Sequence, residues 1–202
     1  MATEITTMLS VADKEALGVA LNEATLVDVE FDEGIRAARV RMDAFSIGVD
    51  ESAETARVVL VLESVSQLIA SLREGRWDDP AAAVTRFQLS ELSSIVRSFG
   101  GLPVYGWDFF DVGEQELSRW GDRLSLSWQS GGSATNAHSL ALFQDGQTRH
   151  LDLCIWFRSV RIEDRSGREI PMATFTEVGR RWWEAFRQND PRTRNSGMFP
   201  LE

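Results

Sequence analysis

The stretch SLALFQDGQTRHLDLCIWF, residues 139–157, decides the fold. Apolar residues alternate with polar ones in both of its halves, and Asp145-Gly146 between them is a strong signal for a two-residue hairpin turn. We therefore expect an antiparallel hairpin between residues 139–143 and 148–157. The register that this turn sets places Ser139 opposite Asp152, Leu140 opposite Leu151 and Ala141 opposite His150.

Further strands with a period of two are expected in the second half of the chain. Residues 104–110 and 124–128 are apolar or alternating, and Ser166-Gly167 marks a turn between 160–162 and 168–172. Because these segments are short and are joined by turn signals, we expect them to form antiparallel sheet together with the hairpin.

The last regular element is predicted to be an amphipathic helix. Thr174 and Glu177 have the spacing of a capping box, which begins a helix. Glu177/Arg181 and Arg180/Glu184 are spaced for ion pairs one helical turn apart. The apolar stripe of this helix consists of Phe175, Val178, Trp182 and Phe186.

The first half of the chain begins with a short helix and a second hairpin. Ser10 followed by Asp13 is a helix-capping pattern, so we expect a helix over residues 11–22. Between residues 27 and 42, apolar and charged residues alternate on both sides of Glu33-Gly34. A two-residue turn there places Val27 opposite Val40, Asp28 opposite Arg39 and Val29 opposite Ala38.

The middle of the chain combines a buried strand with two ambiguous segments. Val58–Leu62 is a continuous apolar run, which predicts a strand covered on both faces. Residues 64–75 and 91–101 each have apolar positions at offsets 0, 3, 4 and 7 followed by glycine. This spacing favours two short helices, but the small polar residues of both segments also suit bent strands, and the two alternatives stay open.

Together these elements predict an α+β fold. It is mostly antiparallel β-sheet, with a C-terminal amphipathic helix and short helices in the N-terminal half; the alternative is an all-β sandwich with one C-terminal helix. At 202 residues the chain is long enough for one compact core. We expect a single globular domain over residues 1–188 and a C-terminal tail over 189–202.

The chain is acidic, with a formal net charge of −10 at pH 7. Residues 1–101 hold 17 of the 31 acidic residues but 9 of the 21 lysines and arginines. Nonspecific binding of nucleic acid requires lysine and arginine to neutralise phosphates, so we expect no nucleic-acid partner. An acidic surface favours a basic protein partner, because their opposite charges steer the encounter.

Other features of the sequence indicate where the protein acts. It has one cysteine, Cys154, so no intramolecular disulfide can form. No apolar run is long enough to span a membrane. The N-terminal MATEITTMLS carries acid and lacks the apolar core of a secretory leader. We expect a cytoplasmic protein with no membrane partner.

Few residues of this chain are suited to catalysis. The two histidines, His138 and His150, point to opposite faces of the expected hairpin, which disfavours a shared metal ion or a proton relay between them. His150, Asp152 and Cys154 share one face, but residues two apart on a strand stand side by side and do not make the successive contacts of a catalytic triad. We expect no catalytic set, no metal and no cofactor.

Tryptophan is abundant, and six of the seven tryptophans follow residue 100. The apolar stripes assign Trp128 and Trp182 to the core. Asp108 and Asp111 lie beside aromatic residues, as acids do where a sugar binds on an aromatic platform. The candidate binding residues are Trp77, Tyr105, Trp107, Asp108, Asp111, Trp156 and Trp183.

Two classes of function fit these observations. We expect a cytoplasmic, non-enzymatic interaction or inhibitor-type protein that binds a partner through an acidic, tryptophan-containing surface, since partly exposed tryptophans beside charges are typical of interfaces. The alternative is a small-ligand-binding protein or hydrolase with an aromatic and acidic pocket. The residues of that pocket are Tyr105, Trp107, Asp108, Asp111 and His150.

Overall fold

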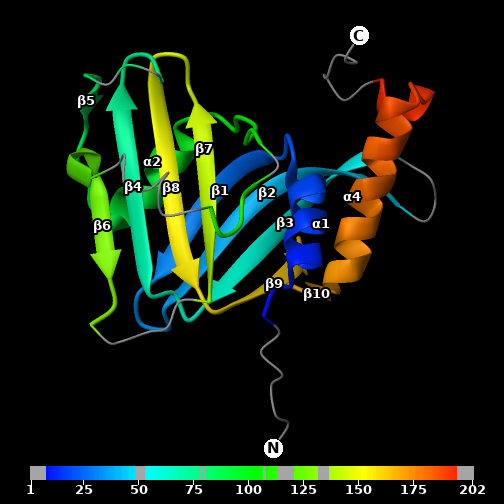
Figure 1. Ribbon diagram of the computed structural model, residues 1–202, viewed down its shortest axis with the longest axis horizontal. Coiled ribbons are helices and arrows are strands. Elements are labelled where there is room, and N and C mark those ends of the chain that lie inside the picture. The colour runs from blue at the N-terminus through cyan, green and yellow to red at the C-terminus, as the bar shows by residue number, and fades with distance from the viewer. Residues whose placement is uncertain are drawn as a thin grey trace, which may run out of the picture.

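Two antiparallel sheets with helices at their margins make up the fold (Figure 1). The computed structural model describes residues 8–48, 53–77, 79, 81–106, 108–112, 121–131 and 137–194. This architecture confirms the predicted α+β fold and its largely antiparallel sheet. One sheet packs on the other, but helices are also present in the N-terminal half, so the fold is not the alternative all-β sandwich with one C-terminal helix.

Within the described residues, each sheet contains five strands. Sheet A has the order β1 (Thr25–Asp32), β2 (Ala37–Ile47), β3 (Ala53–Glu63), β9 (Ser159–Asp164) and β10 (Glu169–Ile170). Sheet B has the order β5 (Ala83–Val84), β4 (Gln67–Glu74), β8 (Arg149–Phe157) and β7 (His138–Asp145), and β6 (Leu126–Gln129) also pairs with β4. The helices described are α1 (Val11–Leu21), α2 (Leu92–Arg97) and α4 (Met172–Arg187), with 3-10 turns η1 (Leu89–Glu91), η2 (Gly121–Arg123) and η3 (Pro191–Thr193).

A bent two-stranded ribbon joins the sheets. Strands β3 and β9 pair in sheet A, and their continuations β4 and β8 pair in sheet B. At the bend Ser64 has a φ of 52°. The Ser66 amide donates to the Trp156 carbonyl (2.9 Å), and the Arg158 amide donates to the Glu63 carbonyl (3.0 Å). Strands that change sheets at such a corner are typical of sandwiches with crossed sheets.

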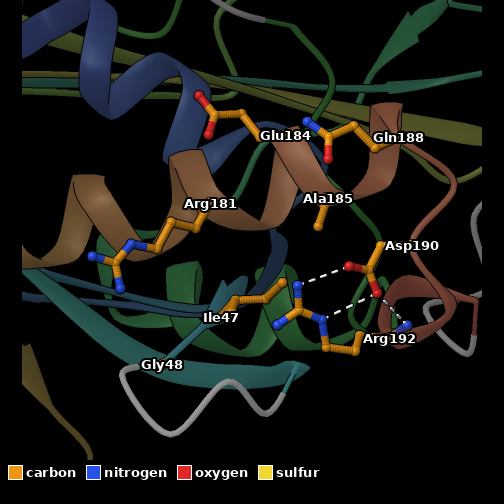
Figure 2. Close-up of a pocket in the computed structure, with 8 residues that line it drawn as sticks. All are labelled: Ile47, Gly48, Arg181, Glu184, Ala185, Gln188, Asp190 and Arg192. Carbon is orange, nitrogen blue, oxygen red and sulfur yellow. Dashed lines mark hydrogen bonds and ion pairs between the residues drawn. The ribbon is translucent and has the colours of Figure 1, made fainter.

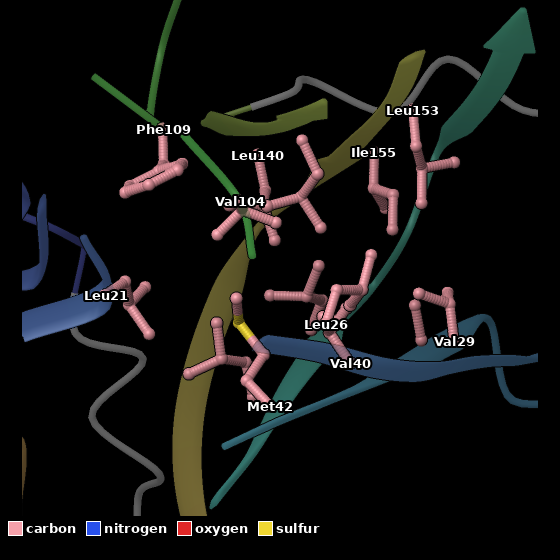
Figure 3. Packing of buried hydrophobic residues seen from close by; sticks show 14 of the residues in the cluster. Leu21, Leu26, Val29, Val40, Met42, Val104, Phe109, Leu140, Leu153 and Ile155 are labelled. Atoms are coloured by element: carbon pink, nitrogen blue, oxygen red, sulfur yellow. The ribbon is translucent and has the colours of Figure 1, made fainter. Parts of the chain in front are cut away.

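The main core lies between the two sheets (Figure 3). Leu26 and Met42 from sheet A and Leu140 and Ile155 from sheet B belong to one buried cluster. The run Val58–Leu62 is buried throughout, as the sequence predicts for a strand covered on both faces.

The hairpin of residues 27–42 forms, but its predicted register is wrong. Residues 33–36 make the turn, and Val29 lies opposite Val40 where the sequence predicts Val27. The Asp32 carboxylate accepts hydrogen bonds from the amides of Gly34 (2.8 Å) and Ile35 (3.2 Å), which stabilises a turn longer than two residues. A register shift between Leu26 and Asp28 then places Leu26 in the main core, while Val27 is only partly buried and lies outside that cluster.

The hairpin of residues 139–157 shows the same kind of difference. Asp145 pairs with His150, and Leu140 lies opposite Ile155 where the sequence predicts Leu151. The Asp145 carboxylate accepts a hydrogen bond from the Gln147 amide (2.8 Å), and Gln147 has a φ of 66°. The local bond of the aspartate therefore widens this turn as well. The shift is by an even number of residues, so every side chain keeps its predicted face.

The two ambiguous segments have different structures. Residues 64–75 contain strand β4, so the strand alternative is confirmed there and the favoured helix is wrong. Residues 91–101 contain helix α2, as favoured. In β4 all residues from Leu68 to Leu72 are buried. A strand that is apolar on both faces satisfies the helical offsets by coincidence, because most of its positions are apolar.

The described residues of the segment 104–110, all but Trp107, do not form the predicted strand. Within it, Phe110 makes an isolated bridge to Leu140, and Pro103, just before the segment, makes one to Thr25. Gly106, with a φ of 119°, interrupts an extended course. The predicted strand at 124–128 is confirmed as β6, which begins at Leu126, and the hairpin between β9 and β10 forms as predicted.

Helices α1 and α4 pack side by side beyond the edge of sheet B (Figure 1). Ser10 caps α1 in a box with Asp13, as predicted. Helix α4 begins before Thr174, with Pro171 as its N-cap, so the predicted capping box at Thr174 is wrong. Pro171 has a fixed φ that suits the start of a helix. The Glu177–Arg181 and Arg180–Glu184 pairs form as predicted. None of the helices in the described residues is long and apolar enough to cross a membrane.

Candidate functional site

The tryptophans proposed as binding residues have very different surroundings. Trp183 is only 6% exposed and packs with Trp182 and Phe186 between helix α4 and strand β2. Trp156 is partly buried on the outer face of sheet B. Trp77 is 60% exposed. Trp107 lies outside the described residues.

The two tryptophans assigned to the core are both packed there. Trp182 is 1% exposed and stacks on Phe45, with ring centroids 4.3 Å apart. Trp128 packs against the main core and meets Phe31 edge-on, while its indole nitrogen donates to Glu33 (2.9 Å).

Asp111 belongs to a hydrogen-bond network that fixes the start of the described chain. Its Oδ2 accepts from Lys14 Nζ (2.8 Å) and from His138 Nδ1 (3.0 Å). Its Oδ1 accepts from the Ser139 amide (2.8 Å). Burial opposes ionisation of Asp111, yet the bonds from Lys14, His138 and Ser139 hold the pKa of its carboxyl below the ordinary value.

Both nitrogens of His138 are engaged in this network. The Leu9 amide donates to Nε2 (3.0 Å), so Nδ1 carries the proton that is donated to Asp111. Asp108 is exposed nearby and lines a separate hollow with Lys14. The histidine therefore acts as a structural tie between strand β7 and the N-terminal segment.

The outer face of sheet B carries His150, Asp152 and Cys154, as predicted, but they do not form a catalytic set. His150 Nε2 donates to the Gly75 carbonyl (2.5 Å), and Asp152 binds Arg73. Burial raises the pKa of the Cys154 thiol to about 12, so it is not a thiolate at neutral pH. His138 lies on the opposite face of the sheet, as predicted.

Acidic, histidine and cysteine side chains in the described ranges form no group of three or more that could hold a metal ion.

A hollow of about 320 Å³ lies between the end of β2 and the C-terminal half of α4 (Figure 2). Its cations already have acidic partners on neighbouring residues. Arg192 binds Asp190 at 2.7 Å, as the dashed lines show, and Arg181 binds Glu177 at 2.9 Å. A ligand there would compete with these pairs.

A larger groove, of about 550 Å³, lies at the end of sheet B where β7 turns into β8, the upper end in Figure 1. We call it the turn-end groove. One wall is the β7–β8 turn, and the other is the loop after α2. Its lining residues are Ser98, Phe99, Leu102, Tyr105, Asp145, Gly146, Gln147 and Arg149.

Arg149 is held in place by the loop wall of the groove. Its Nη2 donates to the carbonyl (2.6 Å) and hydroxyl (2.8 Å) oxygens of Ser98. Its guanidinium carbon lies 4.6 Å from the centre of the Phe99 ring, within the range of a cation–π interaction. Gly146 is required beside it, because a Cβ there would meet the Arg149 carbonyl oxygen at 2.7 Å.

Asp145 is fixed on the turn wall. Its Oδ1 accepts from the Gln147 amide (2.8 Å) and lies 3.1 Å from His150 Nδ1. The Asp145 side chain is 37% exposed. The groove therefore contains a carboxylate and a guanidinium, each held by its own wall.

Two exposed aromatic side chains flank this turn. Tyr105 is 52% exposed and lines the groove. Trp77 follows Gly75, whose amide donates to the Thr148 carbonyl of the turn (2.8 Å). Among the large apolar side chains that the described residues expose, Trp77 and Tyr105 are the aromatic ones. Desolvation raises the pKa of Tyr105, and the negative charges of Glu23 and Asp145 add to this effect.

The structure thus brings Trp77, Tyr105 and His150 to one end of sheet B. The other described candidates, Asp108, Asp111, Trp156 and Trp183, lie elsewhere. Sequence reasoning missed Asp145, Arg149 and Phe99. The Asp145-Gly146 turn was itself predictable. The position of this turn opposite the loop after α2 was not predictable, because the two segments that form the walls of the groove are far apart in the sequence.

Comparisons of the chain with protein-family models, with curated proteins and with solved structures found no match.

Proposed function

We propose that this chain is a non-enzymatic interaction or inhibitor-type protein that binds a protein partner through the turn end of sheet B. The observation that carries the proposal is the exposure of Trp77 and Tyr105 on the two flanks of the same turn. Tryptophan, tyrosine and arginine are the residues that most often dominate the free energy of binding at protein interfaces.

The charged groups of the turn end support binding because they are already ordered. Asp145 is held by the Gln147 amide, and Arg149 is held by Ser98 and Phe99. Side chains that are fixed before association lose little conformational entropy when a partner binds. The turn end therefore combines exposed aromatic area with polar groups in fixed positions.

Stoichiometric binding is favoured over catalysis by the state of the reactive side chains. His138 uses both ring nitrogens in structural hydrogen bonds, and the Cys154 thiol is buried with its pKa raised to about 12. A nucleophile and a base within hydrogen-bond reach are the signature of covalent catalysis. The described residues supply no such pair from these two side chains.

The partner proposed is a basic protein. The net charge of −10 attracts a cationic surface and speeds its encounter at low ionic strength. A cytoplasmic site of action is part of the same proposal, and the single cysteine, which is buried, suits a reducing compartment.

The experiment is affinity purification from native cells with three versions of the tagged chain. The wild type, the double variant Trp77→Ala/Tyr105→Ala and the control Ile35→Ala are compared. Ile35 is a good control because it is 72% exposed and lies in the β1–β2 turn, away from the turn end. A partner in near-stoichiometric yield is expected with the wild type and Ile35→Ala only. Equal recovery by the double variant would overturn the proposal.

A small-ligand-binding role is the second candidate. The observation that favours it is the groove volume of about 550 Å³, which is in the range of small-molecule pockets. Thermal-shift screening against a metabolite library tests this role. A stabilising compound whose effect is lost in Tyr105→Ala supports it, and no stabilisation by any compound argues against it.

A further inference from the structure

We infer that the turn-end groove binds a basic side chain of the partner, with arginine preferred. In this complex Asp145 is the counter-ion of the basic side chain, and the Tyr105 ring is the apolar wall against which that side chain packs. This inference rests on the proposed function and names the chemistry of the partner at that site.

Asp145 has the properties of a preformed counter-ion. Its Oδ1 is held by the Gln147 amide at 2.8 Å and lies 3.1 Å from His150 Nδ1. No lysine or arginine in the described parts of the chain forms an ion pair with it. Its side chain is 37% exposed and lines the groove. A guanidinium entering the groove would form a charge-assisted hydrogen bond with a carboxylate whose position is already fixed.

Tyr105 supplies a suitable wall for a cation. Its ring is half exposed, and a guanidinium can stack on an aromatic face. Glu23 and Asp145 create a negative potential at the Tyr105 hydroxyl, since their charges help to raise its pKa. The same potential attracts a positive side chain to this part of the groove.

Arg149 does not compete for Asp145. It is bound to Ser98 and stacked on Phe99, and it makes no ion pair with Asp145 among the described contacts. A groove that contains an arginine also suits an acidic ligand, with the opposite charge preference. The two possibilities differ in the effect of substituting Arg149, because removal of a like charge strengthens the binding of a cation and weakens that of an anion.

The test is a titration of the ¹⁵N-labelled wild-type protein with three capped tripeptides, followed by NMR. The central residue is arginine, citrulline or glutamate; citrulline is the uncharged analogue of arginine. The arginine peptide should shift the amide signals of Tyr105, Gly146 and Gln147 in a saturable way. The citrulline peptide should bind about tenfold more weakly, the size expected for loss of a charge-assisted hydrogen bond. Equal binding, tighter binding of glutamate or no saturable shift overturns the inference.

Two variants test which charged residue of the groove determines the preference for the arginine peptide. Asp145→Asn keeps an oxygen that accepts from the Gln147 amide, so the turn is expected to persist while the preference for arginine over citrulline disappears. Arg149→Gln should leave arginine binding equal or tighter. A persistent preference in Asp145→Asn, or loss of arginine binding in Arg149→Gln, contradicts the inference. The comparison of peptides on the wild type stands even if a variant fails to fold.

Failure of the inference and failure of the proposed function give different results. If arginine and citrulline bind equally while Trp77→Ala/Tyr105→Ala still loses the native partner, only the basic side chain is excluded. If the double variant retains the partner, the proposed function itself is wrong.

Discussion

Asp28→Ala should destabilise the fold far more than Asp43→Ala, although both aspartates pair with arginine on sheet A. Asp28 is 2% exposed and accepts hydrogen bonds from Ser93 Oγ (2.7 Å), Arg41 Nη1 (2.7 Å) and Arg97 Nη2 (2.5 Å). Two of these donors, Ser93 and Arg97, lie on α2, so Asp28 joins that helix to sheet A. The loop wall of the turn-end groove follows α2 directly.

The magnitude comes from the individual hydrogen bonds. The bonds from Ser93 and Arg41 to a buried carboxylate contribute about 1.5 kcal/mol each. Arg97 is 59% exposed and contributes little. We therefore expect Asp28→Ala to cost about 3 kcal/mol. Asp43 pairs with Arg57 at the surface, and its loss should cost about 0.5 kcal/mol.

The assay is urea unfolding at pH 7 and under acidic conditions. Burial opposes ionisation of Asp28, but Arg97, Ser93 and Arg41 hold its pKa below the ordinary value. A depressed pKa stabilises the fold above the unfolded-state pKa of about 3.9, and this stabilisation is lost as the pH falls through the folded-state pKa. The difference between wild type and Asp28→Ala should therefore shrink in acid. A cost below about 1 kcal/mol at pH 7, or one equal to that of Asp43→Ala, refutes the reasoning.

Three other outcomes are expected. Gly179→Ala should destabilise by about 1–3 kcal/mol in thermal unfolding, because a Cβ there would meet the Ala20 Cβ at 2.7 Å between α1 and α4; a gain in stability, as at an open helical site, would contradict this contact. Cys154 should resist iodoacetamide in the native protein and react after unfolding, since burial raises its pKa to about 12; rapid native labelling would show that the thiol is accessible. Asp111→Asn should cost about 1–2 kcal/mol at pH 7 by weakening the His138 network, and the cost should disappear in acid because the pKa of Asp111 is depressed; a pH-independent cost would exclude the charge as its cause.

The sequence was sufficient for the fold class and for most element types, but not for strand β4, for residues 104–110 or for the register of the hairpins. Alternation predicted both hairpins, with two-residue turns at Glu33-Gly34 and Asp145-Gly146, and both hairpins form with longer turns. Asp32 and Asp145 bind amides within their own turns, and these bonds lengthen each turn beyond two residues. The length of each turn therefore depends on local hydrogen bonds, which the composition of the turn does not specify. In the hairpin of residues 139–157 the shift is by an even number of residues, so the predicted faces are kept, whereas the bulge after Leu26 in the first hairpin changes the pairing by one residue.

Strand β4 and Trp183 show why burial is hard to predict from one segment. The apolar run at 68–72 fits a helix or a fully buried strand, and pairing with β8 decides between them. Trp183 lies beside the apolar stripe of α4, but strand β2 and helix α1 also cover this part of α4. The strand conformation of β4 and the burial of Trp183 both depend on elements that are distant in the sequence.

The candidate site was predictable only in its aromatic part. Trp77 and Tyr105 were candidates because of residue type, and both are exposed. The role of Arg149 depends on the loop after α2, where Ser98 and Phe99 hold its side chain, and Asp145 is fixed by Gln147 and His150 of the hairpin itself. A groove between segments far apart in the chain leaves no local sequence pattern.

Oxidative footprinting of the complex with its purified partner tests the central claim most directly. The oxidation rates of Trp77 and Tyr105 are compared in the free and bound protein. Met8 is the internal control, because it is 62% exposed and lies beside α1. We predict protection of Trp77 and Tyr105 with no change at Met8. Unchanged rates at both aromatic residues in a saturated complex would contradict a partner-binding surface at the turn end of sheet B.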